Sequence, residues 1–239
     1  MIAQLSLIVP AYNEAKGIEA SVAILLEHLP RLAADHEIII VDDGSNDATN
    51  EIVGKLALAN PVIRVVRHET NKGKGAALRT GFLAARKAWV LFVDADRQID
   101  LSEIRTLPDC GDECAGVIGY RISRKDPITR RILSKLFRLG TAMIFKIRAR
   151  DVNCPCKLIR TSFLREIELV SNGFLIDVEI ISKAAEKGLR FLEMPVMFHP
   201  RQDGASSVRF RHLFETAEEL LQLRLLLRKA GQRRTIDGR

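Results

Sequence analysis

Short apolar runs of strand length alternate along this chain with stretches whose apolar residues recur every three or four positions. The runs lie within the first 96 residues and read LSLIVPAY, HEIIIVDDGS, VIRVVRHE and WVLFVDAD. The stretches between them cover residues 17–33, 47–59 and 71–88, and the last opens with the glycine-rich turn NKGKG. Strands and helices that alternate at this spacing predict βαβ units, and therefore a mostly parallel sheet flanked by helices.

Beyond residue 120 this regular alternation gives way to a basic stretch. The pattern then predicts a helix over 173–188 and a strand over 189–200. No Gly-, Ser- or Pro-rich linker interrupts the chain. We therefore expect one α/β domain over 1–209, followed by an amphipathic helix and a basic tail over 210–239.

Polar clusters follow three of the predicted strands. They are Tyr12-Asn13-Glu14, Asp42-Asp43 and Asp94-Ala95-Asp96. Parallel strands present their carboxyl ends at one edge of the sheet, where open α/β sheets bind their ligands. One such cluster is compatible with a simple turn, but three of them indicate a binding site at that edge.

Asp94 and Asp96 end a buried strand with one residue between them. Two carboxylates at this spacing can hold a hard divalent cation, and Gln98 offers a further oxygen. Mg²⁺ and Mn²⁺ prefer oxygen ligands and share their coordination sphere with water and substrate phosphates. The alternative is a capping aspartate followed by a solvated one. The other acidic strand ends favour the metal site.

The first two clusters have the chemistry to hold a nucleoside. Asp43 can accept hydrogen bonds from a base or a ribose, although DDGS is also a good turn sequence. Tyr12 and Glu14 can stack on a nucleobase and hydrogen-bond to it. Pro10 is expected to stop the first strand and to fix the turn that presents them.

The turn NKGKG resembles a phosphate cradle only superficially. The G-x4-G-K-[ST] spacing of a P-loop is missing, and so is a G-x-G-x-x-G pattern with an acid at the right distance. A tight glycine turn that opens a helix accounts for it equally well.

Residues 121–150 hold ten Lys and Arg residues and one acid, a local net charge of +9 within a chain whose total is +7. In DPITRRILSKLFRLG the apolar positions follow helical spacing, and Arg131, Lys135 and Arg138 fall on another face. Such a helix can lie in a bilayer interface beside anionic headgroups. An ordinary surface helix is the alternative. Nucleic acid is disfavoured, because aromatic residues make up only 5% of the chain and no nucleic-acid motif is present.

The four cysteines form two close pairs, Cys110/Cys114 and Cys154/Cys156. Their spacings fit zinc ligation poorly, so we expect small, reduced core or loop residues. No apolar run approaches the roughly 18 residues of a spanning helix. The first residues also lack a basic leader, so the sequence predicts a cytoplasmic protein, peripheral on the cytosolic face of a membrane.

Several of these stretches together resemble family 2 glycosyltransferases of the GT-A fold. More narrowly, the chain resembles the dolichol-phosphate mannosyltransferase and polyprenyl-phosphate glycosyltransferase group. The matching stretches run in family order over residues 9 to about 207: VPAYNE, VDDGSNDAT, NKGKGAALRTG, DADRQ, GFLIDVEII, EMPV and RQDGASS. The resemblance implies an inverting, metal-dependent transfer of a hexose from a sugar nucleotide, such as GDP-mannose or UDP-glucose, to a polyprenyl or dolichyl phosphate.

The resemblance also implies roles for single residues. Residues 1–120 would form the nucleotide-binding half, and 121–209 the half facing acceptor and membrane. The metal, Mg²⁺ or Mn²⁺, would be held by Asp94, Asp96 and Gln98, and Arg121, Arg131 and Ser134 would meet the acceptor phosphate. The sugar nucleotide would contact Pro10, Tyr12, Glu14, Val41, Asp43, Asp94, Ala95, Asp96 and Arg201. The residues expected to be catalytic are Asp96, Arg121 and Arg131.

The chain departs from the family pattern at DVNCPCKLIR, where Pro155 and Cys156 replace Gly and Phe, and after Ser206, where a lysine is often found. These changes leave two alternatives open. One is a transferase with a hydroxyl acceptor, for which Asp151, Asp177 or Glu179 would be the general base. The other is a non-catalytic nucleotide-sugar-binding subunit. A membrane-anchoring partner subunit or a homodimer is compatible with either.

Overall fold

The computed structural model describes residues 2–99, 101, 111–122, 128–145, 147, 149–199, 220 and 223–225, without the side chains of 128–133. The predictions for Arg201, Cys110 and most of 210–239 therefore lie outside the described residues. Arg131 is described only as part of a helix.

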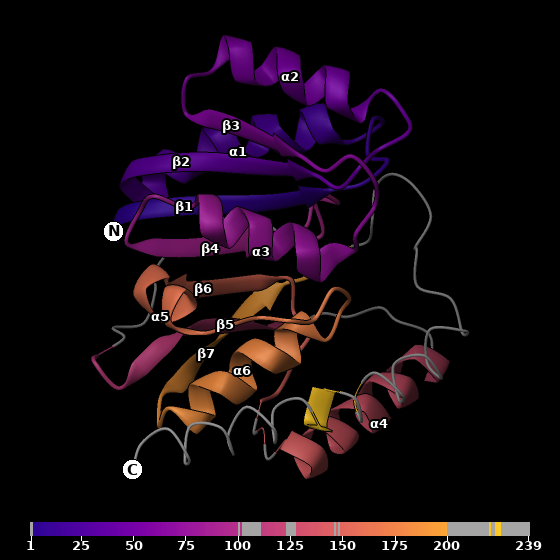
Figure 1. The fold of residues 1–239 in the computed structure, drawn as a ribbon, viewed down its shortest axis with the longest axis vertical. Coiled ribbons are helices and arrows are strands. Elements are labelled where there is room, and N and C mark those ends of the chain that lie inside the picture. The colour runs from indigo at the N-terminus through magenta and orange to yellow at the C-terminus, as the bar shows by residue number, and fades with distance from the viewer. Residues whose placement is uncertain are drawn as a thin grey trace.

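Seven strands form one sheet in the order β3-β2-β1-β4-β6-β5-β7 (Figure 1). The pairs β3–β2, β2–β1 and β1–β4 are parallel. The strands are β1 (Ile2–Ala11), β2 (Ala33–Asp42), β3 (Ile63–Arg67), β4 (Trp89–Val93), β5 (Cys114–Ile122), β6 (Cys156–Arg160) and β7 (Arg190–Met197). The predicted α/β fold with a mostly parallel sheet is confirmed.

The helices observed in the first part of the chain match the predicted stretches. They are α1 (Ile18–Leu32), α2 (Thr49–Ala59) and α3 (Lys74–Ala84). Those of the second part are α4 (Ile128–Phe145), α5 (Thr161–Glu166) and α6 (Ile176–Glu186). Strand β1 continues through Pro10 to Ala11, so the prediction that Pro10 stops the strand was wrong by one residue.

Alternate residues of the central strands pack into two hydrophobic clusters, one on each face of the sheet. Leu7, Ile38 and Ile40 pack with residues of α1 and α2 on one face. Ile8 and Ile39, their neighbours along the strands, pack with α3, α5 and α6 on the other. A strand buried on both faces reads as a continuous apolar run, which is why β1 and β2 have no polar alternation.

Strand β6 is antiparallel to both of its neighbours, β4 and β5. Sequence patterning did not reveal β5, β6 or α5. Cys156, the first residue of β6, and Cys154, two residues before it, lie in the core and are free thiols. Burial raises the pKa of the Cys156 thiol to about 12. Cys114, by contrast, is disulfide-bonded, which corrects the prediction of four reduced cysteines.

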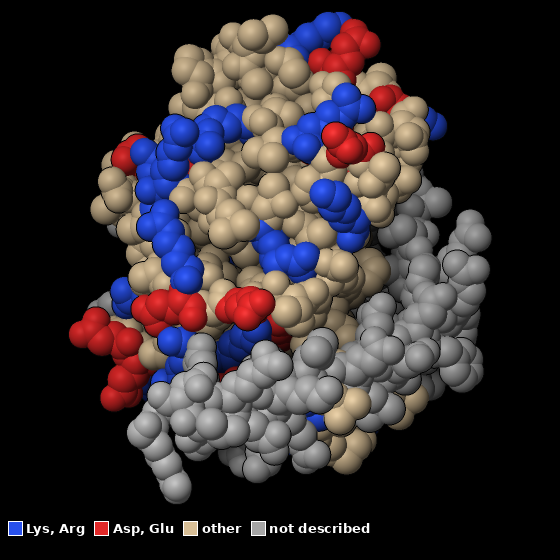
Figure 2. Space-filling model, viewed as in Figure 1, with Lys and Arg blue, Asp and Glu red and all other residues tan. Residues whose placement is uncertain are grey.

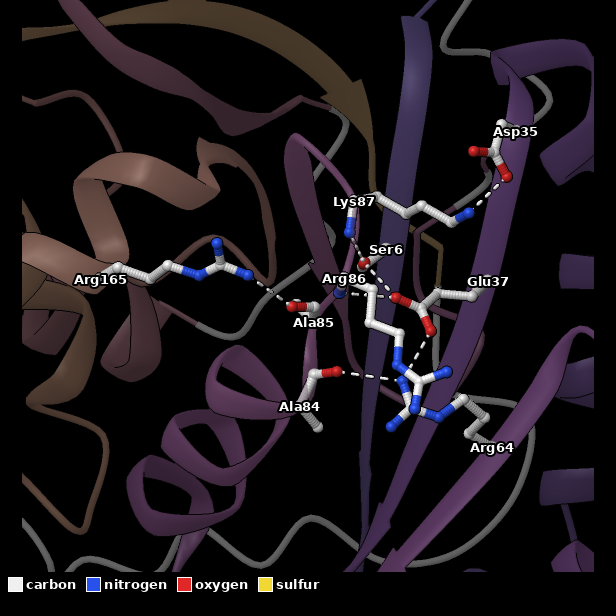
Figure 3. A network of polar contacts seen from close by, with 9 residues as sticks. All are labelled: Ser6, Asp35, Glu37, Arg64, Ala84, Ala85, Arg86, Lys87 and Arg165. Carbon is white, nitrogen blue, oxygen red and sulfur yellow. Dashed lines mark hydrogen bonds and ion pairs between the residues drawn. The ribbon is translucent and has the colours of Figure 1, made fainter.

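A buried polar network fixes the end of the sheet opposite the predicted site (Figure 3). Glu37 of β2 accepts hydrogen bonds from the Ser6 hydroxyl at 2.7 Å, from Arg64 Nη1 at 2.8 Å and from the Arg86 N–H at 2.8 Å. Arg64 also donates to the Ala84 carbonyl at 3.0 Å, at the last residue of α3. The network therefore ties the carboxyl end of α3 to the sheet.

Lys and Arg side chains are spread over the face that α3 covers (Figure 2). Among the described residues, no helix is long and apolar enough to cross a membrane. Leu220 and Leu223, from the predicted C-terminal helix, are buried in a cluster with Phe145 of α4 and Val178 of α6. This part of the C-terminal region thus packs on the domain.

Candidate active site at the carboxyl ends of the strands

The loops that follow β1 and β2 are bonded to one another. The Asn13 N–H donates to the Ser45 hydroxyl at 3.0 Å, and the Asn46 N–H donates back to Asn13 Oδ1 at 2.9 Å. The Glu14 N–H donates to the Thr49 hydroxyl at 2.9 Å. Two stretches about 30 residues apart in sequence therefore form one rigid rim, as the convergence of strand ends predicts.

Tyr12 stands on this rim with 42% of its surface exposed, available to stack on a flat ligand. Pro10 and Val41 are register partners in the parallel pair of β1 and β2. The Val41 side chain is fully buried in the core cluster that includes Ala77 of α3. Val41 is therefore a core residue near the end of β2.

Asp43 is buried, and its carboxylate already has partners within the protein. It accepts hydrogen bonds from the Lys72 N–H at 3.0 Å and the Gly73 N–H at 2.8 Å. Its Oδ1 also lies 2.6 Å from Nδ1 of the buried His68. Within DDGS the Ser45 N–H donates to Asp42 Oδ1 at 3.0 Å, the local contact that the turn interpretation expects. Asp43 positions the glycine turn before α3.

The turn NKGKG owes its glycines to a close backbone approach. A Cβ on Gly75 would lie 2.4 Å from the Ser171 carbonyl oxygen, and one on Gly73 would lie 2.5 Å from the Asn172 oxygen. Gly73 also has φ +93°, which other residues rarely adopt. The Gly75 N–H donates to the Asn172 oxygen at 2.7 Å, so this N–H of α3 is occupied by the protein itself. The phosphate-cradle interpretation is not needed to explain the glycines.

Asp94 and Asp96 lie where β4 ends, and Asp94 forms an ion pair. Its Oδ1 is 2.6 Å from Lys74 Nζ, with 28% of the Asp94 and 17% of the Lys74 side chain exposed. Burial disfavours the charged ammonium, but the charges of Asp94 and Asp177 outweigh it and raise the pKa of Lys74. Lys74 is therefore a cation at neutral pH, held beside the paired aspartates.

Other elements anchor the loop that carries these aspartates. The buried Ser21 hydroxyl of α1 donates to the Ala95 carbonyl. The Gln98 N–H donates to Asp96 Oδ1 at 3.2 Å, and Gln98 Nε2 donates to the His199 carbonyl at 3.2 Å. The Gln98 side chain thus joins this loop to the segment after β7.

The residues of this loop suit a hard cation. Asp94 and Asp96 supply carboxylate oxygens at the surface, and oxygen is the ligand that Mg²⁺ and Mn²⁺ prefer. Among the described residues, no group of three His, Cys, Asp or Glu side chains is arranged to enclose a metal.

Arg121, near the end of β5, forms a bidentate ion pair with Asp151. Its Nε donates to Asp151 Oδ2 at 2.6 Å and its Nη2 to Oδ1 at 2.8 Å. The guanidinium also stacks 5.1 Å from the centre of the Phe198 ring. A bidentate pair with 11% of each side chain exposed gives Arg121 a fixed orientation.

Asp177 and Glu179 of α6 are both buried and serve the structure. Asp177 Oδ1 lies 2.6 Å from Nζ of the fully buried Lys157. Glu179 accepts the Val170 N–H at 2.9 Å and lies 2.9 Å from Lys183 Nζ. Both carboxylates are therefore paired with lysines inside the protein.

Two lysines, Lys74 and Lys157, were not predicted to take part in this region. Lys74 lies within the glycine turn, for which the sequence offers a phosphate cradle or a tight turn but no partner for the lysine. Lys157 follows Cys156 in a segment whose strand was not predicted. Their aspartate partners are 20 residues away in sequence, so local patterning does not reveal either pair. Ser134, predicted to meet the acceptor phosphate, lies on α4.

A mostly parallel sheet with acidic loops at the carboxyl ends of β1, β2 and β4 is the architecture of GT-A glycosyltransferases. One solved example is glucosyl-3-phosphoglycerate synthase from Mycobacterium tuberculosis in complex with Mn²⁺, UDP-glucose and phosphoglyceric acid. It has a TM-score of 0.70 and 20% identity, with coverage of 96% of this chain and 80% of that chain. This likeness confirms the predicted fold.

Residues 6–168 match the model of Glycosyl transferase family 2. Dolichyl-phosphate beta-glucosyltransferase ALG5C of Trichomonas vaginalis is 30% identical over 241 residues, 92% of this chain and 71% of that protein. Polyprenol monophosphomannose synthase of Mycolicibacterium smegmatis is 30% identical over 214 residues, 84% of this chain and 79% of that protein. The chain belongs to glycosyltransferase family 2, as its motifs predicted, and is a glycosyltransferase.

Proposed function

We propose that this enzyme transfers a hexose from a nucleoside diphosphate sugar to a polyprenyl phosphate, with a divalent metal and with inversion at the sugar. The observation that carries the proposal is the D-x-D loop. It places Asp94 and Asp96 at the same sheet edge as the bonded rim of residues 12–14 and 45–49. The names of the two curated relatives, one a glucosyltransferase and one a mannose synthase, support this acceptor class.

On the donor side, Tyr12 and Glu14 would hold the nucleoside, with Pro10, Val41 and Asp43 shaping the rim. Asp94 and Asp96, with Gln98, would hold Mg²⁺ or Mn²⁺. The ion would offset the negative charge that develops on the departing nucleoside diphosphate. The Mn²⁺ bound in the structurally similar synthase supports a metal of this kind.

The carboxylates that could act as a general base are already paired with cations, which favours a phosphate acceptor. A phosphate monoester is already ionised near neutral pH, since its second pKa is about 6. It therefore needs cations to position it rather than a base to deprotonate it. Each candidate base for a hydroxyl acceptor is paired with a cation: Asp151 with Arg121, Asp177 with Lys157, and Glu179 with Lys183. This pairing favours phosphate over a hydroxyl acceptor.

Arg121, Arg131 and Ser134 are the residues that we propose for the acceptor phosphate. Asp151 orients Arg121 through two hydrogen bonds, and an arginine fixed in this way is suited to bidentate phosphate recognition. Direct attack by the phosphate oxygen on the anomeric carbon, opposite the leaving diphosphate, would invert the sugar. The bond that breaks joins that carbon to the diphosphate oxygen.

The decisive experiment measures sugar transfer from UDP-glucose and from GDP-mannose to a polyprenyl phosphate, with Mn²⁺ or Mg²⁺ and with EDTA. We expect transfer from one donor, which EDTA abolishes and which Asp94→Asn and Asp96→Asn reduce by about 100-fold or more. Asp35→Asn, at the opposite end of the sheet, is the matched control and should leave transfer unchanged. Binding of a donor without turnover would instead support a non-catalytic subunit, and transfer only to a hydroxyl acceptor would support the alternative transferase.

We further propose that α4 places the enzyme on an anionic membrane surface, at the cytosolic face. Leu136, Leu139 and Met143 are 57–70% exposed and lie on one side of the helix. Lys135 and Arg138 are exposed beside them. An apolar stripe flanked by cations is complementary to a bilayer interface with anionic headgroups. The opposite side of α4 is held to the domain by Thr141 and Phe145, which are buried.

A further inference from the structure

The ion pair between Lys74 and Asp94 has no role in the function proposed so far. The ammonium lies 2.6 Å from a carboxylate that would bind the metal. Lys74 is the first residue of α3, whereas Asp94 follows β4. The contact therefore joins two elements at the site, and it occupies one oxygen, Oδ1, of a carboxylate that would help to hold the divalent cation.

The backbone around Lys74 is held from both sides. Asp43 accepts the N–H groups of Lys72 and Gly73, and the Asn172 oxygen accepts the N–H of Gly75. Arg79 Nη2 on the next turn donates to Asn172 Oδ1 at 2.6 Å.

The far end of α3 is also fixed. Arg64 and Arg165 donate to the carbonyls of Ala84 and Ala85 (Figure 3). The helix is thus anchored along its length, and the flexible Lys74 side chain is the part that can change partners.

The charges around Lys74 would change when a metal ion and the donor diphosphate bind. In the described structure it lies in the field of three carboxylates, those of Asp94, Asp177 and Asp96. Asp177 is already paired with Lys157. A divalent cation on Asp94 and Asp96 would place two positive groups beside each other, which is unfavourable. The diphosphate that accompanies the metal would offer Lys74 new anionic oxygens.

We propose that Lys74 is the resident counter-ion of Asp94 in the metal-free enzyme and binds the donor diphosphate once the metal is in place. The inference rests on the proposed function, because it takes Asp94 as a metal ligand. The lysine competes with the metal when the metal is alone, and it assists the metal when the diphosphate is present. Its ammonium forms no covalent bond and transfers no proton.

The test compares two affinities in Lys74→Met. Titration with Mn²⁺ alone should show tighter binding than in the wild type by severalfold, because a competing cation is gone. Titration with UDP or GDP, whichever the wild type binds, at saturating Mn²⁺ should show weaker binding by about tenfold, because a charge-assisted contact is lost. The corresponding nucleoside monophosphate should lose less affinity, since it lacks the second phosphate.

Two variants make the comparison specific. Lys72→Met removes an exposed lysine from the same turn and should change neither affinity. Lys74→Arg keeps the charge and should restore both affinities toward wild-type values. Thermal melting of all three variants checks that the fold is intact, and Lys74→Gln replaces Lys74→Met if that variant unfolds.

Opposite shifts in the two affinities would establish the proposal. A Lys74→Met enzyme that binds Mn²⁺ and the nucleoside diphosphate as the wild type does would overturn it while leaving the proposed function standing. Weaker binding of Mn²⁺ alone would also overturn it, because Lys74 would then only support the loop. If the wild type binds no Mn²⁺ at all, the metal site and this inference fail together.

Discussion

Buried carboxylates in this enzyme are stabilised by several donors at once. Glu37 is 6% exposed and accepts from Ser6, Arg64 and the backbone of Arg86. Burial alone would raise the pKa of Glu37, but these hydrogen bonds outweigh burial and lower it below its ordinary value of 4.5. Asp43 and Glu179 also accept hydrogen bonds from backbone N–H groups. Each carboxylate holds segments that are distant in sequence.

Glu37→Gln should destabilise the protein by about 1–3 kcal/mol, because it removes the charge that Arg64 and two further donors satisfy. Because the pKa of Glu37 is lowered in the folded state, its contribution is present above pH 4.5 and is lost as the pH falls through the folded value. Urea unfolding at pH 7 and at several values below 4.5 measures this. The difference in free energy of unfolding between the wild type and Glu37→Gln should become smaller at acidic pH. Asp35→Asn, in the exposed pair with Lys87, is the control and should show little effect.

At the scale of secondary-structure elements, the position of α3 depends on the segment before α6. The backbone of residues 171–173 passes so close to the turn before α3 that only glycine fits at positions 73 and 75. Glu179 holds the same segment through the N–H groups of Val170 and Ser171. A helix from each half of the chain is thereby locked at the site.

Gly75→Ala should destabilise the protein by about 1–3 kcal/mol, because the added Cβ would collide with the backbone of Ser171 and Asn172. Gly54→Ala is the matched control, since Gly54 also lies in a helix but has nothing within 4 Å of an added Cβ. That variant should be stabilised by about 0.5–1 kcal/mol. Thermal or urea unfolding of both decides the matter. Equal effects of the two variants would contradict the close approach.

For the whole molecule, the two faces of α4 differ in what they contact. Its inner face joins the cluster of Ile118, Val178 and Leu223, so the helix is part of the domain. Its outer face exposes Leu136, Leu139 and Met143. Exposed apolar residues that share one helix face, with cations beside them, are what the proposed membrane surface requires.

Leu136→Asp combined with Leu139→Asp should abolish sedimentation of the enzyme with vesicles that contain anionic phospholipid. The reason is that two charges would enter the apolar part of the interface. Leu58→Asp combined with Leu83→Asp is the control, because these leucines are 91% and 83% exposed on α2 and α3. Neutral vesicles should bind the wild type less, and salt should weaken binding. Sedimentation that is equal for all variants would exclude α4 as the docking helix.

Much of the fold and part of the site follow from the sequence alone. Continuous apolar runs predict buried parallel strands, because such strands are covered on both faces. The acidic residues that end those runs predict where the site lies, since parallel strands end together. For this reason a parallel α/β sheet and the grouping of Tyr12, Asp43 and Asp94 at one edge could be anticipated. The GT-A fold and the family were implied by the resemblance of several motifs taken together, from VPAYNE to RQDGASS. Strands β5 and β6 could not, because short apolar runs do not specify a partner or a direction.

Tertiary structure alone decided which charges meet. Nothing in NKGKG indicates that Lys74 would reach Asp94, or that Asp43 would hold the turn's backbone. The pairing of Lys157 with Asp177 depends on the packing of the antiparallel strand β6 against α6. Sequence thus determines which groups are available at the end of each strand, through local periodicity. Packing determines which of them pair, because ion pairs and hydrogen bonds act over a few ångströms in space, whatever the separation along the chain.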